Sequence, residues 1–200
     1  MRPSLVLLAG PNGAGKSTLY QTRVAPRFAG PFVNADIIQR EEIKDPSMEA
    51  SYRAAEVARD RRAELFGAGR SFATETVFSH PSKLEIIEEA RARGYIVIVM
   101  HVGVDSPDLS VARVKGRAVE GGHDVPEEKI RARYTRSQPL IREAILRADR
   151  GMGMVFDNSR LNEPPRQVLA FANGRLLQAA PRLPDWVLWV YADDLQVPIF

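Results

Sequence analysis

The sequence predicts an α/β fold in which helices cover both faces of a mostly parallel sheet. Apolar runs bounded by turn residues predict strands at residues 5–9, 31–36, 71–76, 95–102 and 152–157. Longer amphipathic stretches between them predict helices at about residues 16–27, 48–68, 81–93, 107–119 and 126–148. Strands that alternate with helices need crossover connections, which make neighbouring strands parallel and place helices on both faces of the sheet.

The first predicted strand runs directly into GPNGAGKST, residues 10–18. This stretch has the spacing G-x-x-x-x-G-K-[ST] between a buried strand and a helix start, which is the context of a phosphate-binding loop. Gly13 and Gly15 allow positive φ, so that successive N–H groups converge on phosphate oxygens. The loop predicts a P-loop NTPase, a three-layer sandwich with a five-stranded core sheet. The expected nucleotide contacts are Gly10, Pro11, Asn12, Gly13, Ala14, Gly15, Lys16, Ser17 and Thr18.

Two residues of this loop have specific expected roles. Lys16 is expected to reach the β and γ phosphates and to act in catalysis, and the Ser17 hydroxyl is expected to bind Mg²⁺. The predicted cofactors are therefore ATP, or GTP, and Mg²⁺.

Polar residues follow each predicted strand at its carboxyl end, where ligands bind in open parallel sheets. Besides the phosphate loop, these residues are Asp36, Glu75, Thr76, Asp105, Asp157 and Asn158. Their expected convergence predicts an active site at this edge of the sheet.

The class of enzyme follows from which further motifs the sequence contains. An LSGGQ-like signature of transporter ATPases and the N-K-x-D element of regulatory GTPases are both absent from the sequence. These absences favour a small-molecule kinase, in which a carboxylate takes the proton of the acceptor hydroxyl. Asp36 is the candidate base and an expected substrate contact; the alternative is that it only caps the helix that follows.

The cluster TET supplies one carboxylate and two hydroxyl groups after the third strand. We expect Glu75 and Thr76 to bind the substrate, with the solvent-side end of a strand as the alternative for Glu75. Asn158 and Ser159, after the fifth strand, are the candidate contacts to the adenine base.

Residues 112–137 predict two arginine-rich helices joined by a glycine turn at Gly121 and Gly122. Such a pair is typical of a kinase lid, whose guanidinium groups neutralise charge on the triphosphate. The alternative is a charged hairpin whose arginines pair with neighbouring glutamates. The candidate catalytic arginines are Arg113 and Arg117; Arg131, Arg133 and Arg136 lie on the second helix, and Arg133 and His123 are candidate substrate contacts.

The last part of the chain, about residues 168–200, predicts an extension to the core sheet. Asn173-Gly174 between two apolar runs predicts a hairpin, although the first run also fits the end of a helix. PDWVLWVY, residues 184–191, fits either an edge strand or a packing helix.

Composition sets the remaining expectations. Two hundred residues suit a single kinase domain spanning 1–200, and the absence of cysteine points to a reducing compartment such as the cytoplasm. No segment is apolar and long enough to span a membrane. A net charge of +3 without a dense basic run suits a small anionic ligand at least as well as a polynucleotide, so nucleic acid is the less favoured partner.

In combination, these motifs resemble the zeta-toxin family of kinases. The resemblance covers residues 5 to about 159 and rests on GPNGAGKST, NAD (34–36), ATET (73–76), GGHDVP (121–126) and FDNS (156–159). It implies a fold similar to shikimate and adenylate kinases. The best-known members phosphorylate a sugar hydroxyl of UDP-N-acetylglucosamine with ATP or GTP and Mg²⁺, and a cognate antitoxin protein blocks nucleotide entry, so both are candidate partners.

Carried onto this sequence, the resemblance implies that Lys16 and Ser17 bind the phosphates and Mg²⁺. It further implies that Asp36 is the base, that Glu75 binds the substrate, and that Arg113 or Arg117 contacts the phosphates. The sequence departs from the family at Val77, where a threonine is common, and the second lid arginine of the family corresponds to Arg117, His123 or Arg133.

The leading hypothesis is an ATP-dependent kinase that phosphorylates a hydroxyl of a sugar nucleotide or related metabolite. The alternatives are a nucleic-acid-directed kinase and a low-turnover nucleotide-binding module regulated by an antitoxin.

Overall fold

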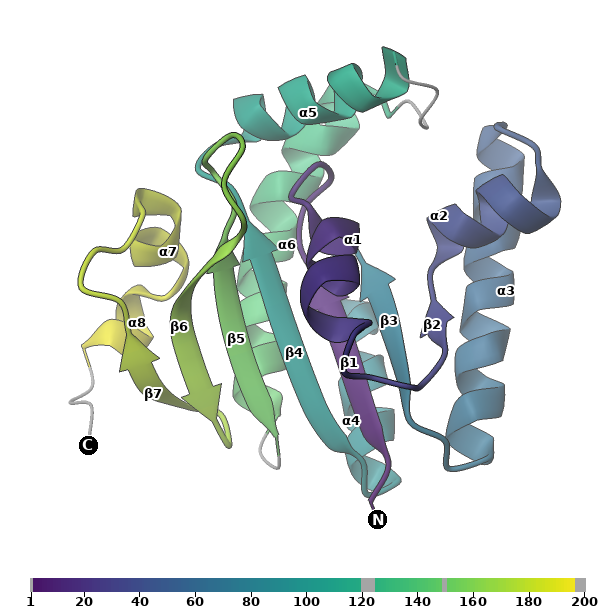
Figure 1. The fold of residues 1–200 in the computed structure, drawn as a ribbon, viewed down its shortest axis with the longest axis horizontal. Coiled ribbons are helices and arrows are strands. Elements are labelled where there is room, and N and C mark those ends of the chain that lie inside the picture. Colours follow the sequence, from purple (N-terminus) through teal and green to yellow (C-terminus); the bar gives the residue numbers. More distant parts are fainter. Residues whose placement is uncertain (1, 120–124, 149–150, 197–200) are drawn as a thin grey trace.

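The computed structural model describes residues 2–119, 125–148 and 151–196. A seven-stranded sheet runs through the molecule in the order β2-β3-β1-β4-β5-β6-β7 (Figure 1). The first five strands are parallel, as predicted, and the last two are antiparallel. Their bounds are β1 Ser4–Ala9, β2 Phe32–Val33, β3 Phe72–Thr76, β4 Ile96–Gly103, β5 Met152–Asp157, β6 Arg166–Ala172 and β7 Arg175–Ala179.

The five long helical stretches of the prediction are confirmed to within a few residues. Their bounds are α1 Lys16–Leu19 continued by η1 Tyr20–Val24, α3 Met48–Gly67, η3 Pro81–Leu84 continued by α4 Glu85–Ala92, α5 Pro107–Val119 and α6 Glu127–Arg147. The remaining helical segments are α2 Ala35–Ile37 with η2 Ile38–Ile43, α7 Asp185–Val190 and α8 Ala192–Leu195. In the described residues, no helix combines the length and hydropathy that crossing a membrane requires.

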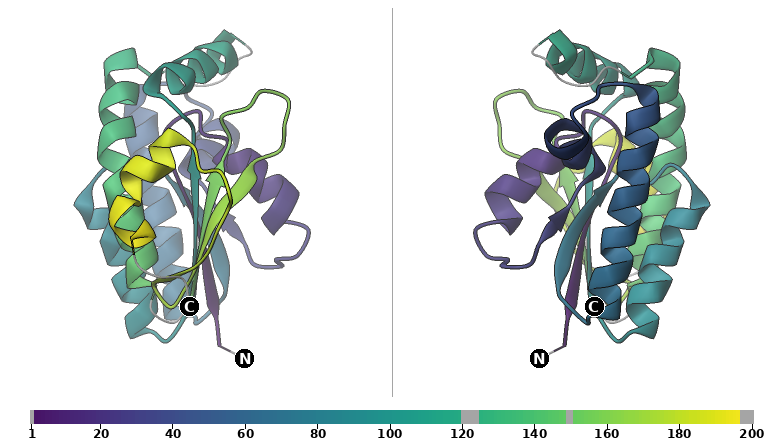
Figure 2. Two further views of the ribbon diagram at one scale, coloured as in Figure 1. Left: turned by 90° about the vertical axis from the view of Figure 1, so that its left-hand side faces the viewer. Right: turned by 90° about the vertical axis from the view of Figure 1, so that its right-hand side faces the viewer.

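Helices lie on both faces of the sheet, as predicted, but unequally (Figure 2). Along β1, Leu5 and Leu7 point into the larger core, which α3, α4, α6 and α7 cover. Val6 and Leu8 point to the opposite face, where α1 and η1 pack. The side-chain period of two along a strand therefore supplies both cores from one apolar run.

The second strand is shorter than predicted. The expectation of a strand over 31–36 is wrong at its end, because the strand stops at Val33 and α2 begins at Ala35. The side chain of Asn34 accepts hydrogen bonds from the backbone N–H groups of Asp36 and Ile37, at 2.8 and 3.3 Å. This cap turns the chain from strand to helix immediately before the candidate base.

The C-terminal hairpin is confirmed as β6 and β7. Asn173 and Gly174 have φ angles of 52° and 72°, as a tight turn between these strands requires. The stretch PDWVLWVY forms the helix α7, not an edge strand, because Trp186 and Val187 are buried in the larger core.

Helix α5 lies across the top of the sheet in Figure 1, and α6 descends from it along one face. The first part of α6 packs on α5 through Ile130, Val111 and Val114. Its second half belongs to the larger core through Ile141 and Ile145. The two helices predicted for a lid are therefore present, and the second half of α6 packs on the sheet.

Candidate active site

The phosphate loop joins β1 to α1, and both of its predicted positive-φ glycines are confirmed. Gly13 and Gly15 have φ angles of 72° and 90°. Gly10 lies against the backbone of β4, since a Cβ at Gly10 would be 2.1 Å from the carbonyl oxygen of Val102. The loop therefore has the backbone curvature that an anion cradle needs.

Asn158 braces this loop from the end of β5. Its Nδ2 donates a hydrogen bond to the carbonyl oxygen of Ala14 at 2.8 Å. Gly15 has no side chain to block this contact, because a Cβ would lie 2.3 Å from the same nitrogen. Asn158 also lines the cavity at the loop, with its amide engaged by the loop itself, and its contact to the adenine base stays a prediction.

Lys16 is buried, with an exposed fraction of 6%. Its Nζ donates hydrogen bonds to the carbonyl oxygens of Gly10 and Pro11, both at 3.0 Å, and lies 3.7 Å from a carboxylate oxygen of Glu75. Two backbone carbonyl groups of the phosphate loop thus hold the Lys16 ammonium group inside the curve of that loop.

Glu75 stands at the centre of the site. Its Oε2 accepts hydrogen bonds from Ser17 Oγ at 2.8 Å and from Asn34 Nδ2 at 3.0 Å. Its side chain is only 10% exposed, so the alternative of a solvent-side strand end is wrong. Because β3 pairs directly with β1, the end of β3 brings this carboxylate against the phosphate loop.

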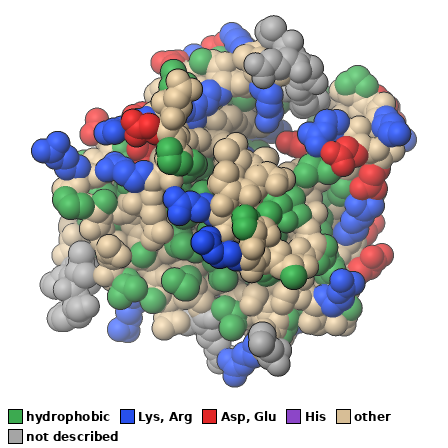
Figure 3. All heavy atoms as spheres, in the orientation of Figure 1, with side chains coloured by type: hydrophobic (Ala, Val, Ile, Leu, Met, Phe, Trp, Pro, Cys, Tyr) green, Lys and Arg blue, Asp and Glu red, His purple; other side chains and the backbone are tan. Residues whose placement is uncertain are grey.

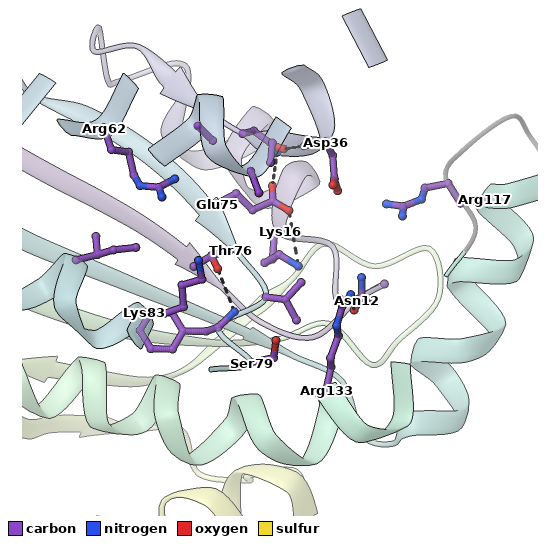
Figure 4. Close-up of a pocket in the computed structure, with 18 residues that line it drawn as sticks. Asn12, Lys16, Asp36, Arg62, Glu75, Thr76, Ser79, Lys83, Arg117 and Arg133 are labelled. Atoms are coloured by element: carbon purple, nitrogen blue, oxygen red, sulfur yellow. Dashed lines mark hydrogen bonds and ion pairs between the residues drawn. The ribbon is translucent and has the colours of Figure 1, made fainter. Parts of the chain in front are cut away.

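Asp36 lies on the first turn of α2 and is exposed toward the cleft. The alternative that it caps this helix is wrong, because Asn34 is the N-cap. Asp36 and Lys16 line the same cavity, whose volume is about 210 Å³ (Figure 4). The candidate base and the phosphate loop therefore face a common space that packed aliphatic groups do not fill.

A strained turn directly after β3 lines part of this cavity. Phe78 is fully buried with φ of 60°, an unusual conformation for a residue with a side chain. Its backbone N–H donates to Thr76 Oγ1 at 3.1 Å. Thr76 lines the cavity as predicted, with its hydroxyl oxygen already accepting this bond.

A second cavity, of about 360 Å³, is lined by the phosphate loop and by arginines of α5. Gly13, Lys16, Glu75 and Arg117 line both cavities, so the two cavities adjoin each other at these residues. The remaining residues of the second cavity are Gly15, Ser17, Thr18, Arg113 and Asn158. Figure 3 shows the surface hollowed beneath α5, with basic side chains at its border.

The lid arginines divide into two groups. Arg113, Arg117 and Arg133 line the cavities, and Arg133 also donates a 3.5 Å hydrogen bond to Asn12. Burial lowers the pKa of Arg113, and the negative charge of Asp157 partly opposes that shift.

The rest of the lid follows the alternative interpretation. Arg131 pairs with Glu127 and Asp108 on the outer surface, and Arg136 donates to the carbonyl oxygen of Ala132. The candidate His123, like Gly121 and Gly122, lies outside the described residues.

The sequence interpretation missed several side chains of the site, among them Asn34, Arg62 and Lys83. Asn34 holds Glu75 and caps α2, and its place before an amphipathic stretch is the cap signal that could have found it. Arg62 and Lys83 line the cavity that contains Asp36. They come from α3 and η3, and a sequence pattern on these helices gives no sign that they face a distant strand end.

Asp157 has a structural role. Its Oδ1 accepts hydrogen bonds from Trp186 Nε1 at 3.1 Å and from Ser159 Oγ. It therefore fixes α7 and the loop after β5, while the adjacent Asn158 reaches the phosphate loop.

The sheet order, the glycine-curved loop and the cleft above it define a P-loop kinase-like α/β fold. Residues 5–140 match the family model AAA_33, described as "AAA domain", and the chain belongs to this family. An uncharacterized protein of Haemophilus influenzae is 26% identical over 139 residues, which are 67% of this chain and 94% of that protein.

Several solved structures have a similar fold. An AvrRxo1-ORF1:AvrRxo1-ORF2 complex with ATP has a TM-score of 0.67 at 15% identity over the whole of this chain, which spans only 66% of that longer chain. A putative kinase from Chloroflexus aurantiacus has a TM-score of 0.54 at 21% identity, covering 69% of this chain and 80% of that one. The PezAT toxin-antitoxin system of Streptococcus pneumoniae has a TM-score of 0.58 at 14% identity, covering 84% and 72%.

Proposed function

We propose that the protein is a kinase of the zeta-toxin type, which transfers the γ-phosphate of ATP or GTP to a hydroxyl group of a small molecule. The observation that carries this proposal is the shared cavity of Asp36 and Lys16, because a base and a phosphate loop that face one space can bind an alcohol between them. The likeness to structures described as a putative kinase and as an ATP complex supports nucleotide use.

The residues present fit a magnesium ion. Ser17 and Glu75 offer two oxygen atoms 2.8 Å apart beside the loop, and the described residues contain no cluster of three acidic, histidine or cysteine side chains. Mg²⁺ suits such a site, because it takes few protein ligands and completes its shell with phosphates and water. When bound, it would neutralise charge on the phosphates. Ser17 and Glu75 are the residues that would hold it.

The chain's own side chains have distinct proposed roles. Lys16 binds the terminal phosphates, after exchanging its hydrogen bonds to the loop carbonyls for bonds to phosphate oxygens. Arg113 and Arg117 approach from α5, on the side of the larger cavity, and balance the negative charge of the transferred group. Asp36 accepts the proton of the acceptor hydroxyl, and Thr76 and Arg133 contact the acceptor.

Product formation from ATP and a panel of hydroxyl compounds, including UDP-N-acetylglucosamine, tests the proposal. Asp36→Asn keeps the shape of the side chain and removes the base, so we expect the rate to fall about 10²- to 10⁴-fold. Lys16→Ala is expected to abolish transfer. Asp60→Asn, a surface carboxylate on α3 that pairs with Arg59, is the matched control. An Asp36→Asn rate within twofold of wild type would refute the role of Asp36, and an active Lys16→Ala variant would refute the kinase itself.

A further inference from the structure

Two basic side chains of the cavity at Asp36 have no partner within the described part of the chain. Arg62 on α3 and Lys83 on η3 both line this cavity, and neither side chain has a hydrogen bond or an ion pair there. The adjacent Arg61 behaves differently, because it turns outward and forms a two-armed ion pair with Glu42. Of these two neighbours on α3, Arg62 is therefore the one that lines the cavity, and it is the one without a partner among the described residues.

Keeping these charges unpaired in a cavity costs free energy. Burial lowers the pKa of Lys83, and the neighbouring charge of Arg62 lowers it further. Burial likewise lowers the pKa of the Arg62 guanidinium. Glu85 and Glu89 on α4 favour the charged forms, but neither comes within ion-pair distance of these two groups. A partly desolvated pair of like charges is what a ligand anion would neutralise.

The position of the pair separates it from the groups expected to bind the nucleotide. In Figure 4, Arg62 and Lys83 lie on the side of the cavity opposite Arg117 and Arg133. Arg117 also lines the larger cavity at the phosphate loop, whereas Arg62 and Lys83 line only the cavity of Asp36. The unpaired charges thus face the acceptor and not the phosphate donor.

We propose that the acceptor is a small hydroxylated acid, whose phosphate or carboxylate group lies between Arg62 and Lys83 while its hydroxyl faces Asp36. A guanidinium fork and an ammonium group together suit a compact anion with several acceptor oxygens. This inference rests on the proposed kinase function and defines its substrate class.

Anion binding tests the site without a known acceptor. Inorganic phosphate is titrated calorimetrically into protein saturated with ADP and Mg²⁺, so that the phosphate loop is already filled. Acetate is titrated in parallel, to distinguish a phosphate site from a carboxylate site. We expect at least one of the two anions to bind. Arg62→Gln and Lys83→Met should each weaken that binding at least about tenfold, because each removes a charge-assisted contact.

Arg61→Gln is the matched control, since it removes the same charge from the same helix but outside the cavity. Its anion affinity should stay within twofold of wild type, and ADP affinity should be unchanged in all three variants. Thermal melting checks their folding, and both cavity variants should melt at or above the wild-type temperature, because an unpaired charge is removed. Absence of binding by both anions, or equal affinity in wild type and both cavity variants, would overturn the proposal.

A kinetic assay on the acidic compounds that wild type phosphorylates gives a second readout. Arg62→Gln should raise KM for the acid much more than it lowers kcat, since it removes binding common to the ground and transition states. Activity confined to neutral alcohols or to UDP-N-acetylglucosamine would also overturn the acidic substrate class. That result would leave the kinase standing, whereas absence of ATP-dependent transfer to every acceptor would refute the kinase itself.

Discussion

Replacing Gly15 by alanine measures how tightly the phosphate loop is held. Gly15 has φ of 90°, and the left-handed region costs an ordinary residue about 1–2 kcal/mol. The new Cβ would also lie 2.3 Å from Asn158 Nδ2, which must then move and lose its 2.8 Å hydrogen bond to Ala14. That bond contributes about 1 kcal/mol net. We therefore expect Gly15→Ala to lower the free energy of unfolding by about 2–3 kcal/mol.

Urea denaturation measures this loss, with two companion variants that separate its causes. Gly94 has φ of 75° and open space around the position of a Cβ, so Gly94→Ala isolates the backbone cost of about 1–2 kcal/mol. Asn158→Ala alone should cost about 1 kcal/mol. In the double variant of Gly15 and Asn158 the hydrogen bond is lost only once, so its cost should fall about 1 kcal/mol short of the sum of the single costs.

Two results would refute the reasoning. One is a Gly15→Ala variant no less stable than Gly94→Ala, and the other is strict additivity in the double variant. Either result would mean that Asn158 does not brace the phosphate loop from the end of β5.

Three further predictions concern the centre of the site, the lid and the core. Glu75→Gln keeps the size of the side chain but removes its charge beside Lys16 and Ser17. The Mg²⁺ concentration for half-maximal ATP turnover should therefore rise about tenfold or more. An unchanged Mg²⁺ concentration would contradict a role of Glu75 at the metal. Arg117→Ala should lower kcat, whereas Arg131→Ala should stay within twofold in the same assay, because Arg131 pairs with Glu127 and Asp108 away from the cavities. Burial lowers the pKa of His101 to about 3, so this ring stays neutral in the folded protein. Since an unfolded histidine takes up its proton near pH 6.5, the His101 contribution to stability should be complete above that pH and decline as the pH falls from 6.5 toward 3; His101→Gln should flatten this decline in urea titrations, and an equal slope would exclude His101 as its source.

The main elements of the fold could be predicted from local patterns. Each parallel strand is a short apolar run, and each long helix has its own amphipathic period, so both signals lie within one segment. The phosphate loop was equally predictable, because the positive φ of Gly13 and Gly15 follows from the spacing of the motif.

The sequence interpretation was wrong or undecided where a short element depends on distant contacts. Residues 34–36 were expected to continue a strand, yet the Asn34 side chain caps α2 and also donates to Glu75. The stretch 184–191 fitted a strand or a helix equally well, and the burial of Trp186 against Asp157 selects the helix. In both places, a contact across the fold decides between local conformations of similar energy.

The sequence by itself determined the parallel sheet, the phosphate loop and the carboxylates at the strand ends, because strand period, glycine spacing and strand ends are local properties of the chain. Only the tertiary structure decided which charges share a cavity. The fold directs Arg117 and Arg133 to the cavity and Arg131 to an ion pair on the surface, and it joins Glu75 to Ser17. It also places Arg62 and Lys83 in the cavity across from Arg117 and Arg133, where neither has a partner within the described residues. The physical reason is that desolvation and charge pairing depend on distances across the folded chain, and sequence spacing does not specify those distances.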